Sequence, residues 1–294
     1  MSATRIIFLT TLSMLAFASN SVLARVALKY TDIDAASFTS IRLISGAIVL
    51  LLVAGFRSRS GDGKGSWWSA AALFTYAASF SFAYVNLSAA TGALLLFGAV
   101  QATMIFYGLW VGERLVKTQL AGLVLAFGGL LMLFLPGWST TPPLSSSLLM
   151  MGAGVCWGIY SLRGKGAGDP LRTSAGNFAR AVVFTAGLSV LLLDRLSLDS
   201  AGVGYAVASG ALTSGLGYVI WYMAMPSLKA TNAAIVQLSV PVIAAAGGIV
   251  FLGEPITLRL TLASSAILGG IALVIIKKRT PRVDAQGTKA QISH

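Results

Sequence analysis

The chain has 294 residues, of which 56% are hydrophobic and only 10% are charged, and its formal net charge is +12. Soluble domains carry about 25% charged residues, so a water-facing surface on this chain would lack the ionic side chains that normally cover it. The composition therefore excludes a soluble globular protein and predicts an integral membrane protein.

Ten apolar segments follow one another along the chain. A bilayer core of roughly 30 Å needs about 20 apolar residues in a helix that crosses it, and each segment is close to that length. The predicted membrane helices are 5–28, 35–56, 67–87, 91–111, 118–136, 146–163, 174–193, 202–224, 231–252 and 258–277. The predicted fold class is all-α and integral to the membrane, with ten transmembrane helices.

The first segment shares with a cleaved secretory leader a basic residue, Arg5, ahead of an apolar run. That run is long for a leader, and the internal repeat described below includes it. We therefore expect residues 5–28 to remain in the protein as the first membrane helix.

Lysine and arginine are unevenly divided between the two sides of this arrangement. With the N-terminus in the cytoplasm, 15 of the 21 basic residues fall in cytoplasmic segments and three fall outside, at Lys29, Arg195 and Arg259. Cytoplasmic loops of membrane proteins carry such an excess. The positive charge therefore predicts orientation, not a nucleic-acid partner. It places both termini on the cytoplasmic side of a bacterial-type inner membrane.

An internal repeat connects the two halves of the chain. The motif VGERL at 111–115 recurs as FLGEPI at 251–256, each time between apolar runs, and the glycine pair at 128–129 recurs at 269–270 with the same offset of 141 residues. Both motifs thus fall at matching places in two copies of a five-helix unit.

The repeat predicts three regions and an architecture. The regions are a first unit at 1–140, a second unit at 141–278 and a basic cytoplasmic tail at 279–294. Because five is odd, the second unit starts on the opposite side of the membrane from the first. Inverted repeats of this kind are typical of secondary transporters, which bind substrate near the membrane midplane between the halves.

Several segments resemble the drug/metabolite transporter superfamily in its EamA-domain branch. They are FASNSVLARVAL (17–28), SFTSIRL (37–43), WVGERL (110–115) and SVPVIAAAGGIVFLGEPI (239–256). The resemblance covers nearly the whole chain and implies export of amino acids or other small metabolites, with the YddG-type aromatic amino-acid exporters as the most similar group. The chain departs from the family in its fourth predicted helix, where GAVQATM (98–104) lacks the common proline.

No carboxylate is predicted at membrane depth, because all nine acidic residues fall between the apolar segments, at their ends or in the tail. An intramembrane Asp or Glu is the usual proton relay and the usual counter-ion for a cationic substrate. This argues against a proton-coupled exporter of organic cations. The lone cysteine, Cys156, and the lone histidine, His294, offer neither a disulfide nor a metal site. We expect no enzyme activity, no catalytic residue, no metal and no cofactor.

Two basic residues are predicted inside the membrane at matching positions of the repeat, Arg42 and Arg180. An intramembrane charge is a functional candidate by default. The alternative is a packing or snorkelling arginine held by backbone carbonyls. Either interpretation disfavours a cationic substrate.

A cavity for an amphipathic solute should be mostly aromatic or apolar, with a few placed polar groups. The predicted helices carry aromatic and amide side chains at spacings that place them on shared helix faces. For each aromatic residue the alternative is core packing or the interfacial belt. The candidates for cavity lining are Asn20, Tyr76, Phe80, Tyr84, Phe97, Gln101, Trp157, Tyr160, Tyr218 and Gln237.

Motion is predicted in the fourth and ninth helices. Pro241 removes a backbone hydrogen bond in the ninth helix and weakens it there. Gly98 gives the fourth helix a site where it can bend or approach a neighbour closely. Pro241 and Gly98 are therefore the candidate hinges.

The sequence predicts a secondary transporter that exports small neutral or zwitterionic metabolites, above all amino acids including aromatic ones, by alternating access and downhill. The partners are a small-molecule substrate and the lipid bilayer, with no nucleic acid. The alternatives are export of another amphipathic metabolite or drug, such as a purine, and a lipid-moving membrane protein. The substrate, any coupling ion and the oligomeric state, monomeric or larger, stay open.

Overall fold

The computed structural model describes residues 2–56, 63–112, 116–135, 141–164, 167–224, 227 and 236–275. Within these ranges every regular element is a helix, and there is no strand. Glu113 and Arg114 of the first motif, the tail at 279–294 and His294 lie outside the described residues. The structure therefore does not bear on the expectations attached to them.

The helices match the ten predicted segments in order. The eighth segment is continuous but changes its helix type, from α8 through the π-helix η2 to α9. A short 3₁₀ turn, η1 (Leu193–Arg195), precedes it. The helices are α1 (Ala3–Tyr30), α2 (Ala35–Phe56), α3 (Trp67–Tyr84), α4 (Ala89–Trp110), α5 (Lys117–Phe134), α6 (Leu144–Gly164), α7 (Pro170–Leu191), α8 (Ser200–Ala208), η2 (Ser209–Leu216), α9 (Gly217–Ala224), α11 (Ser239–Leu252) and α12 (Leu258–Ile275).

Most helix ends lie within a few residues of their predicted positions, but α11 begins at Ser239, eight residues after the predicted start at 231. α7 begins four residues earlier than expected because the side chain of Asp169 accepts hydrogen bonds from the backbone N–H groups of Leu171 and Arg172, and Pro170 occupies the first turn. α11 ends at Leu252, as predicted, and Gly253 after it adopts a left-handed conformation with φ of 61°. The cap at Asp169 thus sets a helix start that hydropathy alone places less well.

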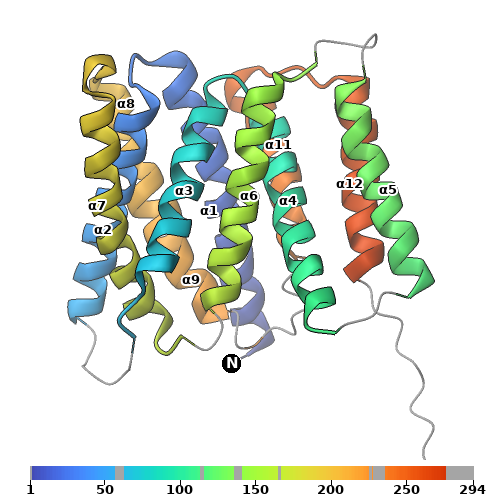
Figure 1. Ribbon diagram of the computed structural model, residues 1–294, viewed down its shortest axis with the longest axis horizontal. Helices are drawn as coiled ribbons and strands as arrows, with labels where there is room; N and C mark the ends of the chain where they lie inside the picture. Colours follow the sequence, from blue (N-terminus) through green and yellow to red (C-terminus); the bar gives the residue numbers. More distant parts are fainter. Residues whose placement is uncertain are drawn as a thin grey trace, which may run out of the picture.

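The helices are long and apolar enough for a membrane protein. Among the described residues, seven helical segments qualify as membrane spans by length and composition, and α11 and α12 are shorter apolar helices. Figure 1 shows the helices standing roughly parallel, side by side. The prediction of an all-helical, multi-pass membrane protein is confirmed.

The two halves run in opposite directions. In Figure 1, α1 rises from the N-terminus at the lower side, whereas α6 starts at the upper side and descends. The packing has the matching symmetry. In the repeat α6 corresponds to α1, α9 to α3 and α11 to α4. Accordingly α6 contacts α3 and α4 of the first half, and α1 contacts α9 and α11 of the second half. The three equivalent pairs α2 with α7, α4 with α11, and α5 with α12 contact each other directly. The inverted five-helix repeat is confirmed, while the boundaries of its two units stay a prediction.

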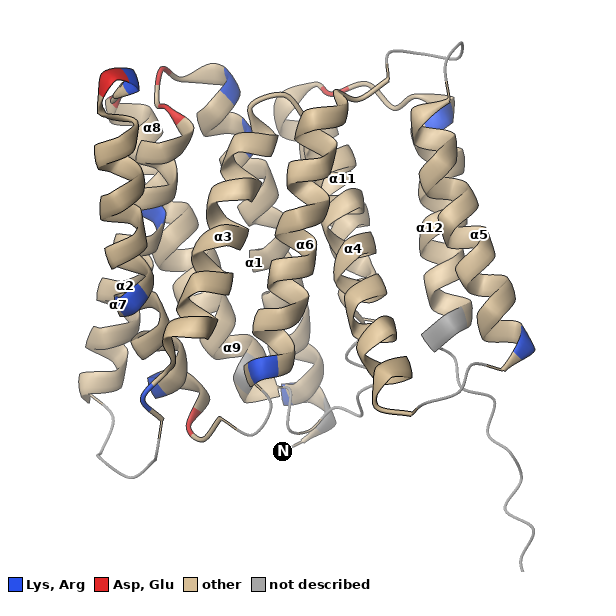
Figure 2. Ribbon diagram, viewed as in Figure 1, with Lys and Arg blue, Asp and Glu red and all other residues tan. Residues whose placement is uncertain are grey.

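Charged residues gather at the helix ends, and few lie along the helices (Figure 2). The acidic residues of the loops that follow α1 and η1, and Glu254 after α11, lie at the end opposite the N-terminus. The membrane-spanning part of the bundle is thus largely uncharged, as the composition indicates.

One carboxylate at this end joins the two halves. Asp34 accepts hydrogen bonds at Oδ1 from the backbone N–H groups of Ala36 and Ser37, both at 2.9 Å, and at Oδ2 from that of Ser197 at 3.0 Å. Its own N–H donates to the Ser197 carbonyl at 3.1 Å. Burial acts to raise the pKa of the Asp34 carboxyl. The hydrogen bonds together lower the pKa by more than burial raises it, so the pKa lies below its ordinary value.

Exchanging Asp34 for alanine should cost about 1 kcal/mol of unfolding free energy, as for loss of a helix cap. Because the folded-state pKa is depressed, the carboxylate stabilises the fold above its unfolded pKa of about 3.9, and this contribution is lost as pH falls through the folded value. Thermal unfolding of the wild type and the variant at neutral pH and at about pH 3 should show the difference shrinking in acid. The matched control is Asp32→Ala, which removes an exposed carboxylate from the same loop. An equal loss in both variants would contradict the prediction.

Candidate functional site

A small cavity lies where α1, α3, α4, α6, η2 and α9 meet. Its volume is about 20 Å³, room for roughly one water molecule. It is lined by Phe17, Asn20, Ser21, Tyr76, Phe80, Leu96, Phe97, Trp157, Thr213 and Tyr218. A metabolite is larger than this space, so it would fit only if the surrounding helices move apart.

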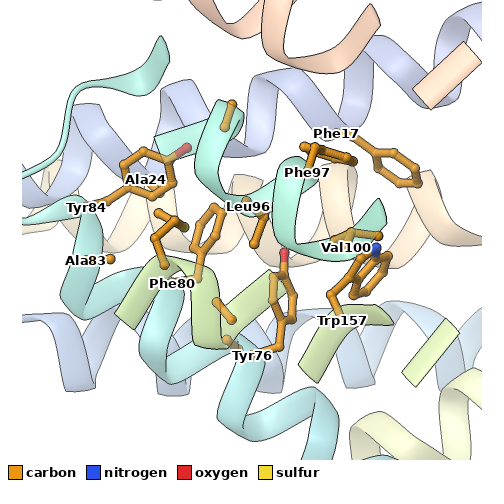
Figure 3. Packing of buried hydrophobic residues seen from close by; sticks show 14 of the residues in the cluster. Phe17, Ala24, Tyr76, Phe80, Ala83, Tyr84, Leu96, Phe97, Val100 and Trp157 are labelled. Carbon is orange, nitrogen blue, oxygen red and sulfur yellow. The ribbon is translucent and has the colours of Figure 1, made fainter. Parts of the chain in front are cut away.

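Six of the ten predicted lining residues border this cavity, from both halves of the chain. Figure 3 shows Tyr76 and Phe80 on α3 facing the same interior as Phe97 and Trp157. The six residues are Asn20, Tyr76, Phe80, Phe97, Trp157 and Tyr218.

Trp157 is at the centre of the aromatic part of the wall. Its ring centroid lies 4.9 Å from that of Tyr76, 4.8 Å from that of Tyr218 and 6.4 Å from that of Phe17. Tyr160 stacks on it from behind at 5.5 Å. Such tilted and edge-on rings present both faces and edges to an apolar ligand.

The polar part of the wall is built around Asn20. Its Oδ1 accepts hydrogen bonds from the hydroxyls of Ser209 at 2.7 Å and Thr213 at 3.1 Å, and its Nδ2 donates to the Tyr76 hydroxyl at 3.5 Å. Ser209 and Thr213 both belong to the π-helical segment η2, and π-helical turns occur often at functional sites. The amide is buried and has its hydrogen bonds satisfied, as a buried amide requires.

Sequence reasoning missed Ser209 and Thr213. The available signal was the run SGALTSGL at 209–216, which places hydroxyls and glycines in the middle of an otherwise apolar segment. Hydroxyl side chains in membrane helices commonly hydrogen-bond across to a neighbouring helix, which is what these two do.

The two predicted intramembrane arginines have unlike surroundings. Arg42 is only 1% exposed. It donates from Nε to the Ser214 hydroxyl at 3.2 Å and from Nη2 to the Tyr76 hydroxyl at 2.9 Å. Its guanidinium carbon also lies 4.7 Å from the centre of the Phe80 ring.

Arg180, by contrast, is half-buried in the middle of α7. Its Nη1 donates to the carbonyls of Lys64 at 2.6 Å and Gly176 at 2.8 Å, and its guanidinium lies over the Trp67 ring. This matches the packing interpretation for Arg180, whereas Arg42 stands directly behind the cavity wall.

The remaining four candidates are buried but do not border the cavity. The Tyr84 ring packs 4.6 Å from that of Phe80. Tyr160 lies behind Trp157 and lines a second small cavity near the start of α7. Gln101 has an amide nitrogen with no hydrogen-bond partner in the described part of the chain, and Gln237 lies just before α11. Their part in substrate binding stays a prediction.

The candidate hinges differ in their surroundings. Pro241 lies in the first turn of α11. Leu238, the residue before α11, is in a turn conformation and separates the helical residues 236–237 from α11. Because proline lacks an N–H, Pro241 cannot donate a helical hydrogen bond, which fits a break at this place. At Gly98 an added Cβ would meet only an Ile267 methyl at 3.9 Å, so close packing does not require a glycine there. Both hinges stay predictions.

A buried ion pair was not predicted. Glu254 stands at a helix end as expected, but its side chain is 9% exposed and its Oε1 lies 3.4 Å from Nε of Arg25, which is 8% exposed. It is the only ion pair among the described residues. The signal for Glu254 in the sequence was a glutamate immediately after the glycine that ends a helix. Its partner Arg25 lies on α1, and no local sequence pattern indicates that the two residues meet.

Comparisons with known proteins agree with this architecture. The sequence matches the profile of the EamA-like transporter family twice, over residues 4–135 and 144–276. An uncharacterized protein of Pseudomonas aeruginosa is 56% identical over 272 residues, which cover 92% of this chain and 94% of that protein. The threonine/homoserine exporter RhtA of Salmonella typhimurium is 32% identical over 149 residues, 48% of each chain. A crystal structure matches the fold with a TM-score of 0.65 at 19% identity, over 92% of this chain and 96% of its own.

Proposed function

The chain belongs to the EamA-like transporter family, and from that premise we propose that it exports small neutral or zwitterionic metabolites, above all amino acids with aromatic or other apolar side chains. The observation that carries the proposal is the central cavity, with aromatic rings on one side and the Asn20 network on the other. An apolar wall with a few fixed polar groups is the usual form of a small-molecule site.

The amino-acid class has support from a relative. RhtA is named as an exporter of threonine and homoserine and is similar to this chain over 48% of its length. The aromatic wall around Trp157 favours larger apolar side chains than these two amino acids have, because stacked rings bind apolar groups. We therefore place aromatic amino acids first among the substrates.

The proposed mechanism is alternating access between the inverted halves. The cavity is too small for an amino acid as it stands, so binding requires movement of the helices around it, and it lies between the repeats, as in other transporters with this construction. We place the N-terminus in the cytoplasm of a bacterial-type cell, because the excess of lysine and arginine falls on that side. A zwitterion carries no net charge, so its export follows its own concentration gradient.

Other amphipathic solutes are the second candidate, since aromatic rings also stack on purines and drugs. A lipid-moving protein is less well supported, because the cavity lies among six helical elements of the bundle and is not a groove along one helix pair.

Counterflow in liposomes that contain the purified protein tests the proposal. Labelled phenylalanine should exchange without a pH gradient, threonine more slowly, and a labelled organic cation not at all. Exchange of the cation alone, or exchange that needs a proton gradient, would contradict it.

Trp157→Ala should reduce phenylalanine exchange roughly two- to tenfold, as expected when an aromatic pair worth about 0.5–1.5 kcal/mol is lost. The measurement is the initial rate of phenylalanine counterflow, with the folded state checked by thermal unfolding. Trp68→Ala is the control, because Trp68 is 77% exposed near a span end. Equal rates for the two variants would remove Trp157 from the site.

A further inference from the structure

We propose that Arg42 makes the central site a receptor for a carboxylate, so that substrates are selected by their carboxylate and not by their ammonium group. Aromatic monocarboxylates without an ammonium, such as 2-hydroxy acids, are then substrates as well. The inference rests on the proposed function only in taking the central cavity as the transport site.

The first argument is that Arg42 is a buried cation without an anion. Buried charges are normally paired, and Arg25, a buried arginine on the cavity-lining helix α1, has Glu254 and two backbone carbonyls. Arg42 has only the hydroxyls of Tyr76 and Ser214 and two aromatic rings. Its Nη1 has no hydrogen-bond partner in the described part of the chain. A ligand carboxylate would supply the missing charge.

The second argument comes from counting donors and acceptors. The Tyr76 oxygen accepts from both Arg42 and Asn20, so its own O–H is left to donate at the cavity wall, which Tyr76 lines. The Asn20 oxygen accepts from the Ser209 hydroxyl and shares the hydrogen of the Thr213 hydroxyl with the Ser209 carbonyl. The wall therefore offers donors, which a carboxylate accepts.

The third argument is the lack of a group for the ammonium. None of the residues that line the cavity is acidic. The ring faces of Tyr76 and Trp157 can attract a cation, but more weakly than a carboxylate does. An isosteric ligand that replaces the ammonium by a hydroxyl should lose little affinity.

Transport of a monoanion also removes the need for a coupling proton. In a cell with a negative interior the membrane potential favours the exit of an anion, whichever way the protein is oriented. The lack of an acidic residue at the cavity is in keeping with an exporter that works without a proton relay.

The test compares two isosteres of phenylalanine. 3-Phenyllactate keeps the carboxylate and replaces the ammonium by a hydroxyl, whereas phenylalaninol keeps the ammonium and replaces the carboxylate by an alcohol. Binding to the purified protein in detergent should be at least as tight for phenyllactate as for phenylalanine. It should be roughly ten- to hundredfold weaker for phenylalaninol, which lacks the charged hydrogen-bond acceptor. Binding of phenylalaninol equal to or tighter than that of phenyllactate would overturn the proposal.

In liposomes with an imposed potassium diffusion potential, the accumulation ratio of labelled phenyllactate should change roughly tenfold for each about 60 mV, and that of phenylalanine should not change. Protein-free liposomes give the background of passive entry. If phenylalanine exchanges but phenyllactate neither binds nor moves, the inference fails and the proposed function stands. If no amino acid moves but phenyllactate binds through Arg42, the proposed function fails and the inference stands.

Arg42→Gln should abolish the preference for phenyllactate over phenylalaninol, and Arg42→Lys should restore part of it. Arg180→Gln is the matched control, because it removes an arginine from the equivalent helix at a site remote from the cavity, and it should leave the preference unchanged. If Arg42→Gln does not fold, Tyr76→Phe removes the hydroxyl that joins Arg42 to the cavity wall and should weaken phenyllactate binding. An unchanged preference in a folded Arg42→Gln or Tyr76→Phe variant would overturn the proposal.

Discussion

Exchanging Glu254 for glutamine should cost roughly 3–5 kcal/mol of unfolding free energy, because it leaves the buried Arg25 without its counter-ion. The pair is less than a tenth exposed, so water does not replace the lost charge. Thermal unfolding of the purified protein would measure the loss. Arg25→Gln should cause a similar loss, since it leaves Glu254 equally unpaired.

The contacts of this pair explain why a single carboxylate has so large an effect. Glu254 accepts hydrogen bonds from the backbone N–H of Ala89 at 3.1 Å to Oε1 and 2.9 Å to Oε2, which caps the start of α4. Arg25 donates from Nη1 to the carbonyls of Tyr84, the last residue of α3, and of Val85 after it, both at 2.9 Å. Four elements, α1, α3, α4 and α11, are thus held together at one end of the bundle. Because α4 and α11 are the predicted moving helices, we also expect altered counterflow.

A double-mutant cycle separates the ion pair from general damage. The double variant with glutamine at both positions should cost less than the sum of the two single variants, because the second change no longer leaves a charge unpaired. Asp194→Asn is the control, since Asp194 is an exposed carboxylate at the same end of the bundle. Additive losses in the cycle, or a loss in Asp194→Asn as large as in Glu254→Gln, would contradict the assignment.

Gly210→Leu should prevent stable folding or remove transport. Gly210 lies in η2 where the backbone of α2 passes very close, and an added Cβ would overlap the carbonyl oxygen of Arg42 and the hydroxyl of Ser45. On the α2 side, Gly46 has its own hypothetical Cβ 3.1 Å from the Gly210 carbonyl. Small residues at such a contact let two membrane helices approach, and overpacking costs about 1–3 kcal/mol or more.

The control for this variant is Gly204→Leu, six residues earlier in the same span. Gly204 is exposed and has nothing within 4 Å of a hypothetical Cβ, so this change should be neutral or slightly stabilising, because leucine favours a helix by up to about 1 kcal/mol over glycine. Thermal unfolding and phenylalanine counterflow of both variants give the comparison. A stable, active Gly210→Leu protein would show that α2 and η2 do not pack this closely.

The close approach at Gly210 also matters for the site. It holds α2 against η2, so that Arg42 on α2 reaches Ser214 on η2 and Tyr76 on α3. A larger residue at Gly210 would move the guanidinium away from the cavity wall. The glycine is therefore needed for the geometry of the site as well as for the packing.

Helix number, helix order and inversion could be predicted from the sequence, because they depend on properties that are local or repeated along the chain. Apolar length predicts a membrane crossing wherever it occurs. The matching motifs at 111–115 and 251–256 and the odd number of helices predict the inverted topology without any contact being known. Six of the ten cavity candidates also border the cavity, because amides and paired aromatics in mid-membrane are placed more favourably inside a bundle than against lipid.

Only the tertiary structure decided which side chains meet. Lipid tails solvate apolar residues about as well as a protein interior does, so a membrane helix that is apolar all round gives little sign of its inward face. For that reason Arg42 and Arg180 looked equivalent in the sequence, although one stands behind the cavity and the other binds loop carbonyls. The pairing of Arg25 with Glu254 across 229 residues and the π-helical turn that directs Ser209 toward Asn20 depend in the same way on how helices far apart in the sequence pack.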